Sequence, residues 1–164
     1  MNMAVGRYGE FAMRLRNRIF WITAVSAFII DQLTKYWVVQ TFDLQQTLAL
    51  LPGVFHFTYV INTGAAFSLF SGKVEWLRWL SLAVSLGLMA LAWFSRWLTF
   101  WEQLGYGFIL GGALGNGLDR FALGYVVDFL DFRLINFPVF NIADVCINIG
   151  IACLLISAWQ KPPK

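Results

Sequence analysis

The chain has 164 residues, of which 59% are hydrophobic and 13% are charged, and its formal net charge is +3. A soluble domain carries roughly 25% charged residues, and a single domain of this length could not bury so much apolar surface. The composition excludes a disordered tail, a collagen-like chain and a disulfide-stapled miniprotein, and the small, scattered basic excess argues against nucleic-acid binding. We therefore predict an α-helical integral membrane protein that forms a single domain over residues 1–164.

Four apolar runs, at 19–39, 77–95, 103–118 and 145–160, predict four transmembrane helices, at about 19–39, 77–95, 103–118 and 142–160. A spanning helix needs about 20 residues, with a range of about 17–25, so the last two runs are short unless their polar ends are included. The first run follows three arginines, but it contains Asp31, Gln32 and Lys35 and has no obvious small-residue cleavage site. We therefore interpret it as a retained helix and not as a signal peptide.

Basic residues set the predicted orientation. They lie before the first helix, between the second and third helices, and at the end of the chain, at Arg14, Arg16, Arg18, Arg96, Lys161 and Lys164. The positive-inside rule places these residues in the cytoplasm, so both termini are predicted to be cytoplasmic and the loops at about 41–76 and 119–140 to lie outside. The bias is incomplete, because the outer side or its edge also carries Lys73, Arg78, Arg120 and Arg133.

The first outer loop is predicted to contain structure of its own. Residues 51–61 combine a Pro-Gly turn with β-branched and aromatic residues, which predicts one or two strands lying on the membrane surface. Residues 62–70 predict a turn and a short amphipathic helix. This loop is therefore more than a connector.

Three acidic residues are predicted to meet at nearly one depth. At about 1.5 Å per residue, Asp31, Asp119 and Asp144 lie about 20–26 Å from the cytoplasmic ends of their helices, in a hydrocarbon core of about 30 Å. Ionisable groups at this depth are costly and usually face the interior of a bundle. Structural ion pairs are a strong alternative explanation for Asp31 with Lys35, four positions away, and for Asp119 with the adjacent Arg120.

Asp128 and Asp144 are better candidates for chemistry, because neither has a basic residue within four positions. Asn141 is predicted to cap the fourth helix with Asp144 at its third position, where the helix dipole favours the ionised carboxylate. Asp128 lies between Val127 and Phe129, and partial desolvation there would favour the neutral acid. If the two carboxyls approach, one can activate water while the other polarises a carbonyl, which is what metal-free peptide hydrolysis requires.

The remaining unusual residues have structural explanations. Gly107, Gly111 and Gly115 recur every four residues and, with Gly112, would let the third helix pack closely against its neighbours and hold Asn116 in place. The single histidine and the two cysteines lack the spacing of metal ligands, so we predict neither a metal nor a cofactor.

Five motifs occur in a fixed order. They are Asp31-Gln-Leu-Thr-Lys35, Asn62-Thr-Gly-Ala-Ala-Phe67, Gly111-Gly-Ala-Leu-Gly-Asn116 with Asp119-Arg120, Gly124-Tyr-Val-Val-Asp-Phe129, and Phe137-Pro-Val-Phe-Asn-Ile-Ala-Asp144. In these motifs and their spacing the chain resembles the bacterial lipoprotein signal peptidases, the signal peptidase II family. The resemblance covers residues 31–144, which is most of the chain.

The resemblance implies a plasma-membrane aspartyl endopeptidase with four helices, cytoplasmic termini, an outward-facing active site and a β-cradle in the first outer loop. Its substrate would be a diacylglyceryl-modified prolipoprotein, cut just before the lipidated cysteine, and its inhibitor would be globomycin. By motif position the catalytic pair would be Asp128 and Asp144. Supporting or substrate-binding residues would be Asp31, Lys35, Asn62, Gly112, Asn116, Asp119, Arg120, Asn141 and Ala143. Lipid and substrate would be the partners of a monomer without cofactor.

Two other classes of protein remain open from the residues alone. A transporter with an intramembrane acid relay also places acids near the outer face, although these acids cluster at one level and the cytoplasmic halves of the helices are nearly bare. A scaffold held together by the glycines is the second alternative, but it gives no reason for separate acids in the second outer loop and the fourth helix.

Overall fold

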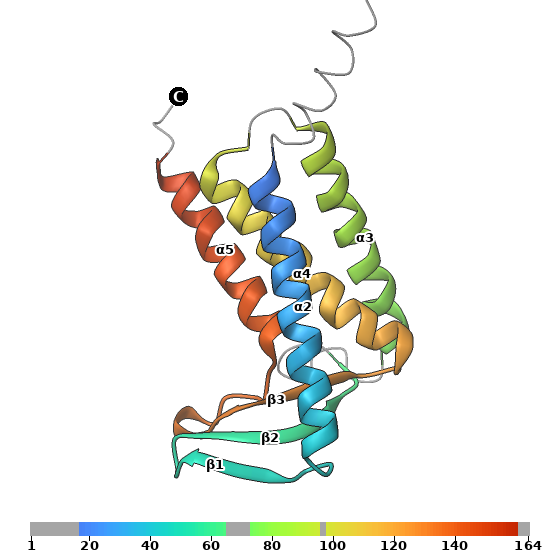
Figure 1. Ribbon diagram of the computed structural model, residues 1–164, viewed down its shortest axis with the longest axis vertical. Coiled ribbons are helices and arrows are strands. Elements are labelled where there is room, and N and C mark those ends of the chain that lie inside the picture. The colour runs from blue at the N-terminus through green and yellow to red at the C-terminus, as the bar shows by residue number, and fades with distance from the viewer. Residues whose placement is uncertain (1–16, 65–72, 96–97, 161–164) are drawn as a thin grey trace, which may run out of the picture.

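The computed structural model describes residues 17–64, 73–95 and 98–160, and within these ranges four long helices form a bundle with a small sheet at one end (Figure 1). The helices are α2 (Arg18–Thr41), α3 (Val74–Phe94), α4 (Phe100–Ala122) and α5 (Ile142–Gln160). A short 3-10 helix, η2 (Arg133–Ile135), precedes α5. The predicted short helix within residues 62–70 falls largely outside the described residues.

The sheet joins both loops that were predicted to lie outside. Its antiparallel strands, in the order β1-β2-β3, are β1 (Thr47–Leu51), β2 (Phe55–Asn62) and β3 (Val126–Phe132). Strand β2 lies in the stretch 51–61 where strands were predicted, but β1 lies almost wholly before that stretch, at Thr47–Leu51. Strand β3 was not predicted, and a sheet built by the first loop alone is wrong. Strand β3 is rich in valine and phenylalanine and carries two acids, Asp128 and Asp131, and its pairing with β2 places Asp128 opposite Val60.

Helix α4 is longer at both ends than the apolar run 103–118. It begins early because Thr99 forms a capping box with Glu102, in which each side chain accepts a hydrogen bond from the other residue's backbone N–H. At its other end it continues to Ala122, so Asp119 and Arg120 lie in the last turns of the helix and not in a loop. Both side chains are thereby fixed on a rigid element.

The glycines of α4 allow close helix packing, as predicted. A Cβ atom added to Gly107 would lie 2.7 Å from the backbone oxygen of Phe20 on α2, and one added to Gly111 would lie 2.7 Å from that of Ala24. A Cβ atom added to Gly112 would collide with the backbone oxygen of Ala143 on α5. Helix α4 therefore packs directly against both α2 and α5, and it brings polar groups of three helices together.

A small apolar core joins the sheet to the end of α2. It consists of Val38 and Phe42 from the helix end and Tyr59, Val127 and Phe129 from the strands. The strand that carries Asp128 is thus packed against the bundle.

Two of the described helices, α3 and α5, are long and apolar enough to cross a membrane. Large apolar side chains also cover the outside of α2, where Ile22, Leu33 and Tyr36 are more than half exposed. Such a surface is suited to lipid and not to water.

Candidate active site

A cavity of about 840 Å³ lies where β2, β3, α4 and α5 meet. Asp128 and Asp144 both line it, together with Asn62, Asn116 and Arg120. Its apolar wall includes Phe137, Val145, Ile147 and Ile149. The structure therefore brings the two candidate acids into one cavity that has a polar side and an apolar side.

Asp144 is held by the predicted capping arrangement, which the structure confirms. The Asn141 side chain accepts a hydrogen bond from the Asp144 backbone N–H at 3.0 Å, and the Asp144 carboxylate accepts one from the Asn141 backbone N–H at 3.2 Å. The other Asp144 oxygen accepts a hydrogen bond of 2.9 Å from the Asn116 side-chain amide. Asp144 thus sits in the first turn of α5, where N–H donors and the helix dipole stabilise a carboxylate.

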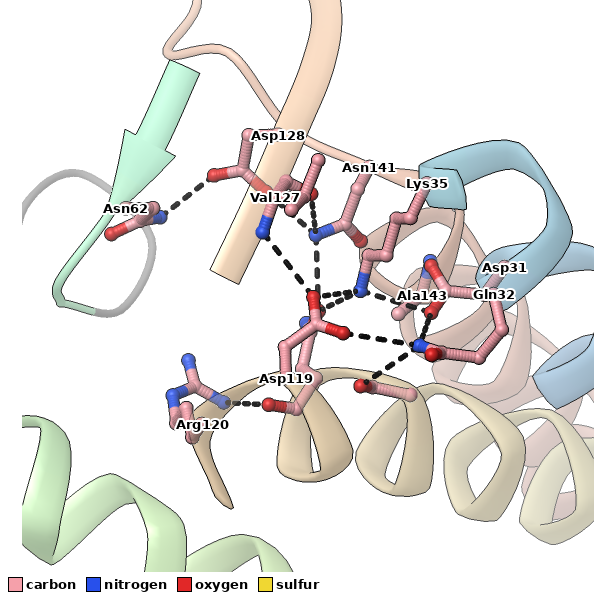
Figure 2. Close-up of polar contacts among 12 residues, drawn as sticks. Asp31, Gln32, Lys35, Asn62, Asp119, Arg120, Val127, Asp128, Asn141 and Ala143 are labelled. Carbon is pink, nitrogen blue, oxygen red and sulfur yellow. Dashed lines mark hydrogen bonds and ion pairs between the residues drawn. The ribbon is translucent and has the colours of Figure 1, made fainter. Parts of the chain in front are cut away.

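Asp128 is almost completely buried, with 1% of its surface exposed. Its two oxygens accept hydrogen bonds from the side-chain amides of Asn141, at 2.6 Å, and Asn62, at 2.8 Å (Figure 2). Burial, aided by the charge of Asp144, raises the pKa of Asp128 to about 7, although the two amides oppose this shift. The predicted desolvation of this acid is confirmed, and Asp128 can hold a proton near neutral pH.

Lys35 connects the acids of α2 and α4. Its ammonium nitrogen lies 2.9 Å from a carboxylate oxygen of Asp31 and 2.9 Å from one of Asp119. The predicted Asp31–Lys35 pair is confirmed, but the pairing of Asp119 with Arg120 is wrong, because Asp119 pairs with Lys35 instead. Asp119 also contacts the sheet, because its carboxylate accepts a hydrogen bond of 3.2 Å from the backbone N–H of Val127 on β3.

Arg120, in the last turns of α4, also lines the cavity. Its guanidinium donates hydrogen bonds to the backbone oxygens of Gly64, at 3.1 Å, and Asn116, at 3.3 Å. It therefore ties the end of α4 to the chain just after β2.

Ala143 and Gly112 support the site through the backbone. The N–H of Ala143 donates to Asp31 at 2.9 Å, and the Ala143 carbonyl leaves no room for a side chain at Gly112. Gln32 was not predicted as a site residue, although it lies inside the first motif. Its amide bridges the carboxylates of Asp31 and Asp119, at 3.1 and 3.2 Å.

The histidine and the cysteines do not contribute to the cavity. Cys146 and Cys153 are free and buried, and the Nε2 atom of His56 accepts a hydrogen bond from Gly53. None of the three lines the cavity.

The fold defines the class of protein. A bacterial membrane enzyme, solved by the in meso method at 2.3 Å, superimposes with a TM-score of 0.78 at 30% identity, over 87% of this chain and 93% of that one. A second such structure, at 1.9 Å, gives a TM-score of 0.76 over 86% and 92% of the two chains. The chain has the fold of a membrane enzyme.

The sequence comparisons identify the family. The family model for signal peptidase (SPase) II matches residues 23–160. A lipoprotein signal peptidase from Nostoc sp. is 74% identical over 93% of this chain and 96% of its own length, and that of Gloeobacter violaceus is 58% identical over 93% and 88%. The chain belongs to the signal peptidase II family.

Proposed function

We propose that this chain removes signal peptides from prolipoproteins by cleaving before the diacylglyceryl-modified cysteine, with Asp128 and Asp144 activating water. The observation that carries this proposal is that both carboxyls line one cavity and that each accepts an amide N–H from a fixed asparagine. The apolar wall of the same cavity suits the lipid chains of such a substrate.

The environments of the two acids differ in their N–H donors, and we assign the two acids different protonation states. Asp144 accepts two N–H donors in the first turn of α5 and serves as the carboxylate. Asp128, whose pKa is raised to about 7, serves as the acid. Asp144 takes a proton from water as the water oxygen bonds to the scissile carbonyl carbon, and Asp128 gives its proton to the carbonyl oxygen. The C–N bond then breaks, Asp144 returns its proton to the leaving cysteine nitrogen, and Asp128 recovers a proton from the new hydroxyl group.

The remaining site residues hold this pair. Asn62, Asn116 and Asn141 supply the amide donors, and Arg120 secures the rim of the cavity at Gly64. We also propose that all four helices cross the plasma membrane of a bacterial cell, that both termini are cytoplasmic, and that the cavity opens at the outer face to substrate and lipid. The proposed enzyme works as a monomer.

The test is a gel-shift cleavage assay in detergent, with EDTA present throughout. It uses a diacylglyceryl-modified prolipoprotein and the same protein without lipid. Wild-type enzyme should cleave the lipidated form alone, and Asp128→Asn and Asp144→Asn should each lower the rate at least about a hundredfold, as expected when a general acid or base is lost.

Asp131→Asn is the matched control. Asp131 is a second buried acid of the same strand, but it is bonded to Thr58 and Arg133 and does not line the cavity. This variant should retain activity within about twofold. Near-normal cleavage by Asp128→Asn would show that the catalytic pair is assigned wrongly, and no cleavage of either substrate by folded wild-type protein would reject the peptidase.

A further inference from the structure

Lys35 is a buried cation beside the candidate catalytic pair that the mechanism above does not use. Only 3% of its surface is exposed. Besides its ion pairs with Asp31 and Asp119, its ammonium group donates a hydrogen bond of 2.9 Å to the side-chain oxygen of Asn116. An ammonium group can donate but cannot accept, so this contact fixes which end of the Asn116 amide faces Lys35.

The orientation of Asn116 determines what Asp144 receives. With its oxygen facing Lys35, Asn116 directs its NH2 group to Asp144 at 2.9 Å. The Asn141 NH2 group also donates to the Asn116 oxygen, at 3.0 Å, but the same group makes a shorter contact of 2.6 Å with Asp128. The charge-assisted bond from Lys35 is therefore the stronger of the two that hold the amide.

Removing the cation would change the surroundings of this amide in two ways. The Asn116 oxygen would lose its charged donor, and the carboxylates of Asp31 and Asp119 would be left without their counter-ion. Buried carboxylates that have lost their counter-ion attract further N–H donors, so the Asn116 NH2 group would turn toward them and away from Asp144.

We propose that Lys35 is a positioning residue that holds the Asn116 amide in the one orientation that donates to Asp144. The inference rests on the proposed function, because it assigns to Lys35 a role in keeping the water-activating carboxylate ready. Lys35 does not line the cavity, and its hydrogen-bond link to Asp144 runs through Asn116, while its charge also acts on Asp144 across space.

The charged groups around Asp144 come from three elements. Helix α2 contributes Lys35 and Asp31, helix α4 contributes Asp119 and Arg120, and strand β3 contributes Asp128. A variant that changes Lys35 alone therefore changes both the amide and the charge balance of this set. The two effects are separated by neutralising one acid at the same time.

The experiment measures kcat, KM and the pH profile of kcat for lipidated prolipoprotein. The variants are Lys35→Met, Lys35→Arg and the charge-compensated double variant Lys35→Met with Asp31→Asn. Gln103→Met is the control, because Gln103 is a buried polar residue near the other end of α4 and bonds to the backbone of Leu98. Wild-type turnover and its loss in Asp128→Asn, measured in the same assay, test the proposed function separately.

We expect Lys35→Met and the compensated double variant to lower kcat at least tenfold while KM stays within about twofold. The acid limb of their pH profile should move to higher pH, because a carboxylate that has lost an N–H donor takes up a proton more readily. Lys35→Arg keeps a donor-only cation and should keep the position of the wild-type profile, as should Gln103→Met.

A purely structural lysine gives a different pattern. In that case the compensated double variant regains the wild-type kcat and profile once it folds, and this result would overturn the proposal. A profile for Lys35→Arg that is displaced as far as that of Lys35→Met would overturn it as well.

Discussion

Asp128 lies in an environment that is unusual for an acid on a strand. Its neighbours Val127 and Phe129 are buried in the apolar core, and its own oxygens accept hydrogen bonds from two side-chain amides, those of Asn62 and Asn141. Burial raises the pKa of Asp128 from 3.8 to about 7, so the folded protein binds a proton there that the unfolded chain releases. Folding and catalysis are therefore linked at this single residue.

The linkage predicts how stability depends on pH. Because the pKa of Asp128 is raised on folding, its stabilising contribution to the free energy of unfolding is fully present below about pH 4 and is lost as the pH rises to about 7. Asp128→Asn mimics the protonated acid at every pH. It should melt at least about 3 °C above wild type at pH 8, the shift expected for roughly 1 kcal/mol in a chain of this size, and close to wild type at pH 4.

Asp131 gives a control in which the effect of pH on stability has the opposite sign. Tryptophan fluorescence in detergent can report the melting of both variants. Although burial favours its neutral form, hydrogen bonds from Thr58 and Arg133 outweigh that effect and lower the pKa of Asp131. Its contribution is therefore present at neutral pH and is lost on acidification. Asp131→Asn should lower the melting temperature at pH 8, and equal shifts of the same sign in both variants would contradict the assignment.

At the scale of elements, α4 organises the site. Its glycines bring α2 and α5 close enough for Lys35 and Asp144 to reach the same asparagine, Asn116. Its last turns carry Asp119 to the sheet and Arg120 to the cavity rim. Helix α4 carries glycines where its backbone packs against α2 and α5, and it carries polar residues in its last turns, where it contacts the sheet and the cavity.

Gly112→Ala tests this close packing. The added methyl group would press against the Ala143 carbonyl and would lie 2.7 Å from the Ile147 side chain, so α5 must move away at its first turn. A displacement approaching 1 Å at Asp144 is enough to lower kcat by about a hundredfold, and we expect a loss of at least tenfold together with a lower melting temperature.

Gly87→Ala makes the same chemical change on α3, where no atom of the described residues lies within 4 Å of the added Cβ. It should leave kcat unchanged and stability equal or slightly higher, since alanine is the better helix former by about 1 kcal/mol. An equal loss of activity in both variants would mean that the helix contacts of α4 are not what positions Asp144.

Local patterns explain which elements could be predicted. Apolar runs predicted all four helices, and Asn141 with Asp144 predicted the start of α5 correctly because a capping box is a contact over three residues. The same signal at Thr99 and Glu102 could have predicted the start of α4. Strand β3 was readable from its β-branched and aromatic residues, but its pairing with β2 joins two distant loops.

Contacts between distant residues explain what could not be predicted. Neighbours in sequence made Arg120 the apparent partner of Asp119, whereas the actual partner, Lys35, comes from another helix. The bonds from Asn62 and Asn141 to Asp128 depend in the same way on how three elements pack. Charge and spacing identify such residues as candidates, but only the packed bundle decides which of them meet.

At the scale of the whole molecule, the length of each helix matches the thickness of a bilayer. Helices α2, α3, α4 and α5 have 24, 21, 23 and 19 residues, which correspond to about 36, 32, 35 and 29 Å against a hydrocarbon core of about 30 Å. Helices α2 and α4 contain charged residues, but Asp31, Lys35, Asp119 and Arg120 are buried in the bundle. Polar residues that face protein and not lipid are compatible with a membrane span.

Cysteine labelling tests whether the two ends of the bundle lie on opposite sides of the membrane, as four spans require. Gln46 lies beside the sheet and Gln160 ends α5 at the opposite end of the molecule, and both are exposed (Figure 1). A membrane-impermeant maleimide should label Gln46→Cys in intact cells and Gln160→Cys only after lysis, while wild type sets the background because Cys146 and Cys153 are buried. Four spans place these two ends on opposite sides of the bilayer, with the cavity beside the sheet on the outer side. Labelling of both positions from the same side would contradict the four-span arrangement, even if the cleavage assay succeeds.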